Sequence, residues 1–189
     1  MADFNKLLTP GDYENGEINV VIEIPMGSTQ KIEYERKTTM FTVDRIEPDI
    51  FAKPTNYGFI PQTLDEDGDE LDVLLVSPLQ LTTGTYIKAK ILGVMHFVDD
   101  GEVDDKVIAV PADDRSTGDI YKDFNDLPEK LIKQLEFHFM HYKDLKKPGS
   151  TVVKGFAGIE EAKKVITDSI VRWDKKCKNT SRKSAKIVA

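Results

Sequence analysis

The sequence has a single cysteine and no long apolar run. Because Cys177 is the only cysteine, no disulfide can form within the chain, and a disulfide-stapled secreted protein is excluded. No segment approaches the roughly 20 consecutive apolar residues of a membrane-spanning helix. The N-terminus also lacks the basic start and apolar stretch of a secretion signal. We therefore expect a cytoplasmic protein with no membrane partner.

Several common catalytic patterns are missing as well. The three histidines, His96, His138 and His141, do not show the spacing of metal ligands. There is no glycine-rich phosphate loop, no Ser-His-Asp arrangement and no internal repeat. Chemistry in this chain must therefore come from other groups, of which carboxylates are the most conspicuous.

The hydrophobic content of 40% over 189 residues suits one compact domain, which we predict over residues 1–173. Residues 174–189 carry six basic side chains and one acid, so the net charge of −7 leaves about −12 on the remainder. We predict that this basic tail is disordered. An acidic body repels nucleic acid, and it would repel phosphates too unless cations intervene. No nucleic-acid partner is therefore expected.

The chain is organised around residues 65–76, which place six acids in eight positions and then enter an apolar strand. Asp72 lies inside that strand, where a carboxylate must be neutralised, paired or bound to a metal. Gly68 would let Asp67 and Asp69 fold back toward Asp72. Three hard oxygen donors could then converge on divalent ions.

An EF-hand calcium loop is the first alternative, because Asp65, Asp67 and Asp69 occupy its first, third and fifth positions. The sixth position requires glycine but is Glu70, and the twelfth requires a bidentate glutamate but is Val76. The EF-hand interpretation therefore fails, whereas a simple solvated acidic loop stays open as an alternative.

A second acidic stretch places five acids in the seven positions 99–105, at the tip of a predicted β-hairpin. Mutual repulsion among these acids favours either a bound cation or full solvation. Earlier in the chain, a predicted strand over 30–36 alternates, with Lys31 and Glu33 on the face opposite its apolar side chains. On its own, that charged face is typical of a solvated strand surface.

Taken together, these motifs resemble one known family. The heptapeptide Asp-Gly-Asp-Glu-Leu-Asp-Val at 67–73 is similar to the signature of the family I soluble inorganic pyrophosphatases, in particular the short, bacterial-type members. Glu23-Ile-Pro followed by Lys31-Ile-Glu33 resembles the second motif, and Asp99, Asp104 and Lys106 have the spacing of the third. The motifs occur in the family's order over approximately residues 20–173.

The resemblance implies hydrolysis of pyrophosphate to two orthophosphates by a Mg²⁺-activated water held between carboxylate-bound metals. Asp69 would be the general base. The metal ligands would be Asp67, Asp72, Asp99, Asp104, Glu33 and Glu23. Substrate would be bound by Lys31, Arg45, Tyr57, Lys106, Tyr142 and Lys143. Several Mg²⁺ ions are implied, with Mn²⁺ or Zn²⁺ as substitutes.

A run of short predicted strands followed by two helices, the second over 159–173, indicates an α+β fold. The resemblance implies more, namely a five-stranded antiparallel OB-like barrel with flanking helices, assembled as a homohexamer. Two residues depart from the family pattern: Lys53 stands where a tyrosine is usual, and Met26 where many members have Lys or Arg.

Two other classes of function stay open. A metal-binding module without catalysis would explain both acidic stretches but would leave Lys31, Arg45 and Lys143 without a role. An OB-type nucleic-acid binder would use the basic tail, although that tail lacks aromatic residues for base stacking.

Overall fold

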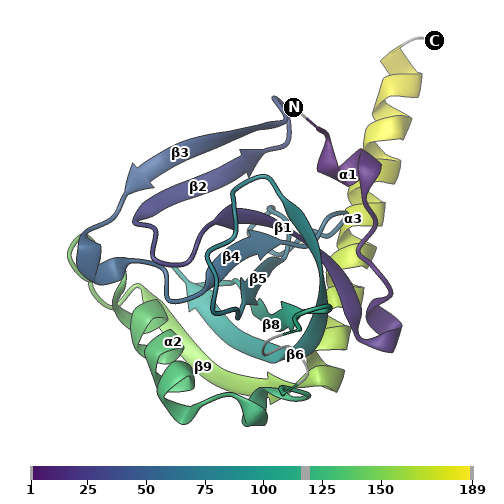
Figure 1. Ribbon diagram of the computed structural model, residues 1–189. Coiled ribbons are helices and arrows are strands. Elements are labelled where there is room, and N and C mark those ends of the chain that lie inside the picture. Colours follow the sequence, from purple (N-terminus) through teal and green to yellow (C-terminus); the bar gives the residue numbers. More distant parts are fainter. Residues whose placement is uncertain (1, 116–119, 188–189) are drawn as a thin grey trace.

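The computed structural model describes residues 2–115 and 120–187, with side chains as far as Asn179 (Figure 1). Five of the described strands form a closed ring. In order around it they are β1 (Glu17–Ile24), β4 (Asn56–Phe59), β5 (Asp72–Leu75), β8 (Lys106–Pro111) and β6 (Tyr86–Asp99). Pairing of β6 with β1 closes the ring. The mixed, sheet-dominated architecture with a few helices agrees with the predicted α+β class.

One pairing in the ring differs from the prediction of an antiparallel sheet. β5 and β8 run parallel, with Asp72 opposite Lys106 at the start of both strands. The chain leaves β5, passes through β6 and turns back into β8, which inserts between them. Because β8 is antiparallel to β6, it runs in the direction of β5. The order of strands in space cannot be read from the order in sequence, and the all-antiparallel prediction is wrong here.

Close approach of β1 and β4 depends on a glycine. A Cβ atom at Gly58 would lie 2.0 Å from the carbonyl oxygen of Val21, so a larger residue would push the two strands apart. This contact fixes the position of Tyr57, the neighbouring residue of β4, which pairs across to Leu74 of β5. Tyr57 is thereby held next to β5.

Four further strands are described outside the ring. β2 (Gln30–Glu35) and β3 (Met40–Ile46) form a separate hairpin, which runs along the upper side of the ring in Figure 1. β7 (Glu102–Val103) pairs with the end of β6 and forms the acidic hairpin tip. The strand β9 (Thr151–Gly158) also pairs with β6 and was not predicted, because its two glycines obscure the strand pattern.

The helices are α1 (Phe4–Leu7), α2 (Glu129–His141) and α3 (Ile159–Ile187), with short 3₁₀ turns η1 (Tyr13–Asn15), η2 (Asp49–Phe51) and η3 (Phe124–Asp126). Ala162 and Ile166 of α3 pack into the core cluster inside the ring. Leu135 and Phe139 of α2 join a second cluster with Phe97 of β6. Figure 1 shows α2 beside β9 and α3 on the other side of the ring.

The last helix is longer than predicted. The backbone of residues 174–187 continues α3, which therefore ends at Ile187 rather than near Trp173. The segment contains no glycine or proline, and extending an existing helix avoids the costly nucleation step. Residues 188 and 189 lie outside the described part of the chain. Among the helices that are described, none is long and apolar enough to cross a membrane.

Candidate active site

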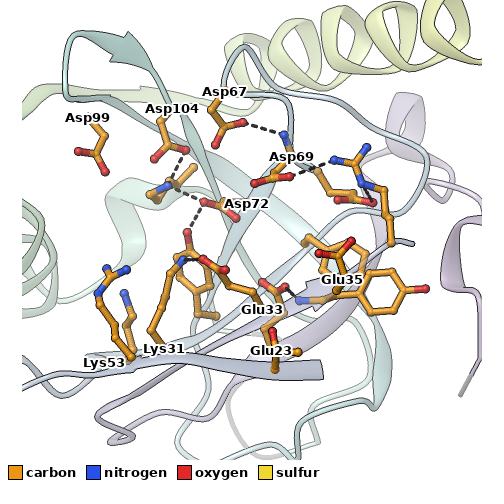
Figure 2. Close-up of a pocket in the computed structure, with 18 of the residues that line it drawn as sticks. Glu23, Lys31, Glu33, Glu35, Lys53, Asp67, Asp69, Asp72, Asp99 and Asp104 are labelled. Carbon is orange, nitrogen blue, oxygen red and sulfur yellow. Dashed lines mark hydrogen bonds and ion pairs between the residues drawn. The ribbon is translucent and has the colours of Figure 1, made fainter. Parts of the chain in front are cut away.

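A cavity of about 1020 Å³ lies between the β2–β3 hairpin, the acidic loop 65–70 and the ends of β5, β6 and β8. All thirteen residues that the sequence predicted for the site line this cavity. Figure 2 shows that the predicted carboxylates and Lys31 come from separate elements and face one shared space. The roles assigned to them individually stay predictions.

The acidic loop is a tight turn. The backbone N–H of Asp65 donates to the carbonyl oxygen of Asp69 at 2.7 Å, and Gly68 has a φ of +94° that favours glycine. The carboxylate of Asp67 accepts a hydrogen bond from the N–H of Asp69 at 3.0 Å. The turn thus orients Asp67 toward the cavity, as the sequence suggested for Gly68.

Arg36, in the turn after β2, anchors this loop and was missed in the sequence. Its Nη2 donates to the carbonyl oxygen of Gly68 at 2.5 Å and to Asp69 Oδ1 at 3.0 Å. Its Nε lies 3.3 Å from Glu70 Oε1, which also accepts from Asn5 at 2.6 Å. The Asp69 side chain is 80% exposed, so Arg36 is the contact that restrains it. No motif links residues that lie so far apart in the chain.

The carboxylate of Asp72 is paired rather than isolated. Lys106 Nζ donates to Asp72 Oδ2 at 2.6 Å and to Asp104 Oδ1 at 2.8 Å, and the Tyr57 hydroxyl also donates to Asp72 Oδ2. The Lys106 side chain is 2% exposed. Burial alone would lower its pKa, but Asp72 and Asp104 outweigh burial and raise the pKa above its usual value. In the sequence, the nearest neighbours of Asp72 are acids, and only the parallel β5–β8 pairing supplies its cation.

Despite the Lys106 ammonium, the carboxylates of Asp67, Asp72 and Asp104 still repel one another. Burial, followed by repulsion from Asp72 and Asp104, raises the pKa of Asp67 to about 6, against a hydrogen bond from Asp69 that lowers it. Burial also raises the pKa of Asp104, with Lys106 opposing and Asp72 adding to the rise. Ionising all of these carboxylates together is therefore unfavourable, and a bound cation would relieve it.

The end of β6 meets the end of α2 at Asp99. The Tyr142 hydroxyl donates to Asp99 Oδ2 at 2.9 Å, and Lys143 Nζ donates to both oxygens at 2.5 and 2.6 Å. Burial and the Asp99 carboxylate raise the pKa of Tyr142. The end of the helix thus places a hydroxyl and an ammonium beside one carboxylate.

On the hairpin side of the cavity, Lys31 Nζ lies 3.1 Å from Glu33 Oε1. Glu23 of β1 is buried and accepts the N–H of Tyr34 at 2.7 Å. Burial, with repulsion from Asp72, raises the pKa of Glu23 to about 8, although Lys31 opposes this rise. Glu23 therefore holds its proton more strongly than an ordinary glutamate does.

Arg45 of β3 faces the same cavity, with Nε donating to Glu47 at 2.5 Å and Nη1 to Asp44 at 2.7 Å. Of the two departures from the family pattern, Lys53 lines the cavity. Met26 is not among its lining residues, and its backbone N–H instead bonds Asn56 Oδ1 at 3.0 Å.

The carboxylates of the cavity are suitable ligands for a hard cation such as Mg²⁺. Their arrangement in the structure, however, is not that of a formed metal site. Carboxylate oxygens are what Mg²⁺ prefers, and the raised pKa values of Asp67 and Asp104 mark a place where positive charge is favourable. Within residues 2–115 and 120–187, no three potential ligands are grouped closely enough to hold a metal ion. The Lys106 ammonium instead lies between Asp72 and Asp104.

Comparison with known proteins gives a consistent result. A family model described as inorganic pyrophosphatase matches residues 20–174. An inorganic pyrophosphatase of Neisseria meningitidis serogroup B is 66% identical over 175 residues, covering 93% of this chain and 99% of that protein. One of Haemophilus influenzae is 65% identical, with 93% and 100% covered.

Solved structures agree. A crystal structure of an inorganic pyrophosphatase from Neisseria gonorrhoeae has a TM-score of 0.90 and 67% identity, covering 91% of this chain and 99% of that one. One from Thermus thermophilus has a TM-score of 0.82 and 34% identity, with 88% and 97% covered. The shared motifs, the matched length and the structural similarity lead to one conclusion: the chain belongs to the inorganic pyrophosphatase family.

Proposed function

We propose that this protein hydrolyses inorganic pyrophosphate to two orthophosphates with the help of Mg²⁺. One observation carries the proposal: among the described residues, nine acidic and eight basic side chains line a single cavity. A cavity of acids alone would suit a metal-binding module, and one of bases alone would suit a simple anion site. The mixture suits an anionic substrate that arrives with divalent cations.

The carboxylates would hold the cations. Asp67, Asp72 and Asp104 are proposed for the first ion, with Asp72 shared with a second. Asp99, Asp104 and Glu33 are proposed for ions that accompany the substrate, with Glu23 beside them. Bound divalent ions would lower the pKa of a water molecule and neutralise charge on both phosphates. Mn²⁺ or Zn²⁺ could substitute for Mg²⁺.

Asp69 is proposed as the general base that accepts the proton of the attacking water. Its exposed carboxylate is held at the cavity by Arg36 and by the turn at Gly68. A carboxylate in this place can exchange its proton with solvent after each turnover. Arg36 would keep Asp69 oriented, a part that sequence reasoning did not assign.

The cationic and hydroxyl groups would bind the phosphates. These are the residues Lys31, Arg45, Tyr57, Lys106, Tyr142 and Lys143, all of which line the cavity. Most of them are paired with carboxylates here, so binding of substrate requires exchange of partners. Lys106 would move from its carboxylate contacts toward a phosphate oxygen as cations bind Asp72 and Asp104. This exchange of partners by Lys106 would couple cation binding to substrate binding.

Phosphate release from pyrophosphate by the purified protein tests the proposal, measured with Mg²⁺ and with a chelator. We expect release that requires Mg²⁺ and little release from ATP. A folded protein that binds Mg²⁺ but releases no phosphate would overturn the proposal in favour of a metal-binding role.

Three wider expectations belong with this proposal. The closed ring of five strands would be an OB-like barrel within a single domain over residues 1–173. The protein would work in the cytoplasm, with pyrophosphate rather than nucleic acid as its partner. It would assemble as a homohexamer, which sedimentation equilibrium would test directly.

A further inference from the structure

Lys53 has a fixed backbone and a buried side chain. It lies between η2 and β4, where its N–H donates to Ser28 at 3.0 Å and its carbonyl accepts from Gly27 at 2.8 Å. These bonds tie it to the turn after β1. Only 9% of the residue is exposed. The side chain therefore enters the cavity from a rigid support rather than from a mobile loop.

The ammonium of Lys53 is surrounded by aromatic rings. Its Nζ lies 4.8 Å from the ring centre of Tyr57, 5.3 Å from that of Tyr142 and 5.4 Å from that of Phe139. Each of these rings lines the cavity. Contacts of this kind attract a cation but supply no counter-charge.

Lys53 differs in this from three other lysines that line the cavity. Lys31, Lys106 and Lys143 each have a carboxylate oxygen within 3.1, 2.6 and 2.5 Å respectively. In the part of the chain that the structure describes, the Lys53 ammonium has no ion pair. Figure 2 shows Lys53 beside Lys31, both extending toward the aspartates across the cavity.

An unpaired buried ammonium is unfavourable for the folded protein. Burial, together with repulsion from Lys31 and Lys106, lowers the pKa of Lys53 to about 7, while Asp72 opposes the shift. Such a group is retained more readily where a ligand supplies the missing negative charge. Pyrophosphate, bound in the same cavity, carries that charge.

We propose that Lys53 is a further substrate-binding residue, whose ammonium donates to a phosphate oxygen of pyrophosphate or of the orthophosphate product. This inference rests on the proposed function. It gives a role to one departure from the family pattern, since a tyrosine in this place could donate a hydrogen bond but could not add positive charge. The rival explanation is a structural one, in which Lys53 only packs against the three rings.

The test compares the wild type with Lys53→Met, which keeps the length of the side chain and removes its charge. A charge-assisted hydrogen bond lost from the bound state should raise KM for pyrophosphate at least about tenfold, with a smaller change in kcat. Orthophosphate binding, measured by calorimetry with Mg²⁺, should weaken if the product contact exists. Weakening for pyrophosphate alone would assign the contact to the substrate.

Lys130→Met is the matched control, because Lys130 is exposed on α2 and does not line the cavity. It should change KM less than twofold. Melting temperatures separate the two explanations: substrate binding predicts that Lys53→Met is no less stable than the wild type. Should Lys53→Met fold poorly, Lys53→Gln offers a second neutral variant for the same measurements.

Proton uptake on binding of pyrophosphate is a further measurement. A Lys53 side chain that only packs against the three rings would not affect it. Binding of an anion should raise the pKa of Lys53, so calorimetry at pH 7.5 in two buffers should show less proton uptake for Lys53→Met than for the wild type. Unchanged KM, phosphate affinity and proton uptake in the neutral variants would overturn the inference. An inactive wild type would instead overturn the proposed function, and the two failures are thus distinguishable.

Discussion

Asp72 and Lys106 form the central pair of the cavity, because each is the first residue of its strand and the two strands run side by side. A buried lysine between two carboxylates offsets part of their repulsion when no cation is bound. Divalent ions bound at Asp72 and Asp104, as proposed, would therefore compete with Lys106 for the same oxygens.

Replacing Asp72 tests its proposed role as a shared metal ligand. Asp72→Asn keeps the shape of the side chain but removes its charge, so Mg²⁺ affinity should fall by about tenfold or more. Titration calorimetry without substrate measures this directly. Asp113→Asn, at an 81% exposed side chain outside the cavity, is the control and should bind Mg²⁺ as the wild type does. Equal affinities for Asp72→Asn and wild type would remove Asp72 from the ligand set.

Glu23 predicts a pH dependence of stability. Its pKa is about 8 in the folded protein, against an ordinary value of 4.5, so the folded state holds a proton that the unfolded state has lost. The stability from this group is full below pH 4.5 and is lost as pH rises toward 8.

Glu23→Gln stays neutral and should escape this loss. Between pH 5 and pH 8, it should gain on the order of 3 kcal/mol in unfolding free energy relative to the wild type. Urea unfolding in the presence of a chelator measures the difference. The control is Glu160→Gln, because the Glu160 side chain is 84% exposed. A constant difference between Glu23→Gln and wild type across this range would contradict the buried, neutral carboxyl.

At the scale of elements, the acidic loop is held from two sides. Arg36 binds its tip, and Arg172 of α3 binds its start through the carbonyl of Leu64 at 2.8 Å and Asp65 Oδ1 at 2.9 Å. The Asp65 side chain is 3% exposed, and burial raises its pKa to about 7, with Arg172 among the groups that oppose the rise. The helix thus positions the loop as well as covering the core.

Arg172→Met would leave the Asp65 carboxylate buried without its cation. Because Arg172 is itself 31% exposed, we expect a loss of about 2 kcal/mol in unfolding free energy, less than for a fully buried pair. Activity should also fall, since the loop carries Asp67 and Asp69. Lys164→Met, which breaks an exposed pair with Glu161 on the same helix, should cost less than about 0.5 kcal/mol. Similar losses for both variants would show that Arg172 does not anchor the loop.

The elements that could be predicted from sequence are those with a local pattern. The β-branched run of β1, the alternation of β2 and the apolar stripe of α2 follow from residue spacing. The parallel β5–β8 pair and strand β9 could not be predicted in this way, because both depend on contacts between distant segments.

The same distinction applies to the site. All thirteen residues predicted from the motifs line one cavity. Arg36 and Lys53 also line it, but they belong to none of these motifs and had no role predicted from sequence. The role of Arg36 can be recognised only from its contacts with the acidic loop in the folded protein. Lys53 was noticed as a departure, but its burial among three rings depends on the folded arrangement.

At the scale of the whole molecule, an acidic protein is proposed to bind a highly charged anion. Repulsion between an acidic protein and an anion is small in the described cavity, because its basic residues are nearly as numerous as its acidic residues before any metal binds. Each cation that binds the carboxylates would make the cavity more positive. Mg²⁺ should therefore be required for both chemistry and substrate affinity.

The most direct test is phosphate release from pyrophosphate over a Mg²⁺ titration, for the wild type and Asp69→Asn. We expect no release in chelator and release that rises with Mg²⁺ in the wild type. Asp69→Asn should bind Mg²⁺ as well as the wild type, but its turnover should be slower by about 100-fold or more. Release independent of Mg²⁺, or full activity in Asp69→Asn, would contradict the account.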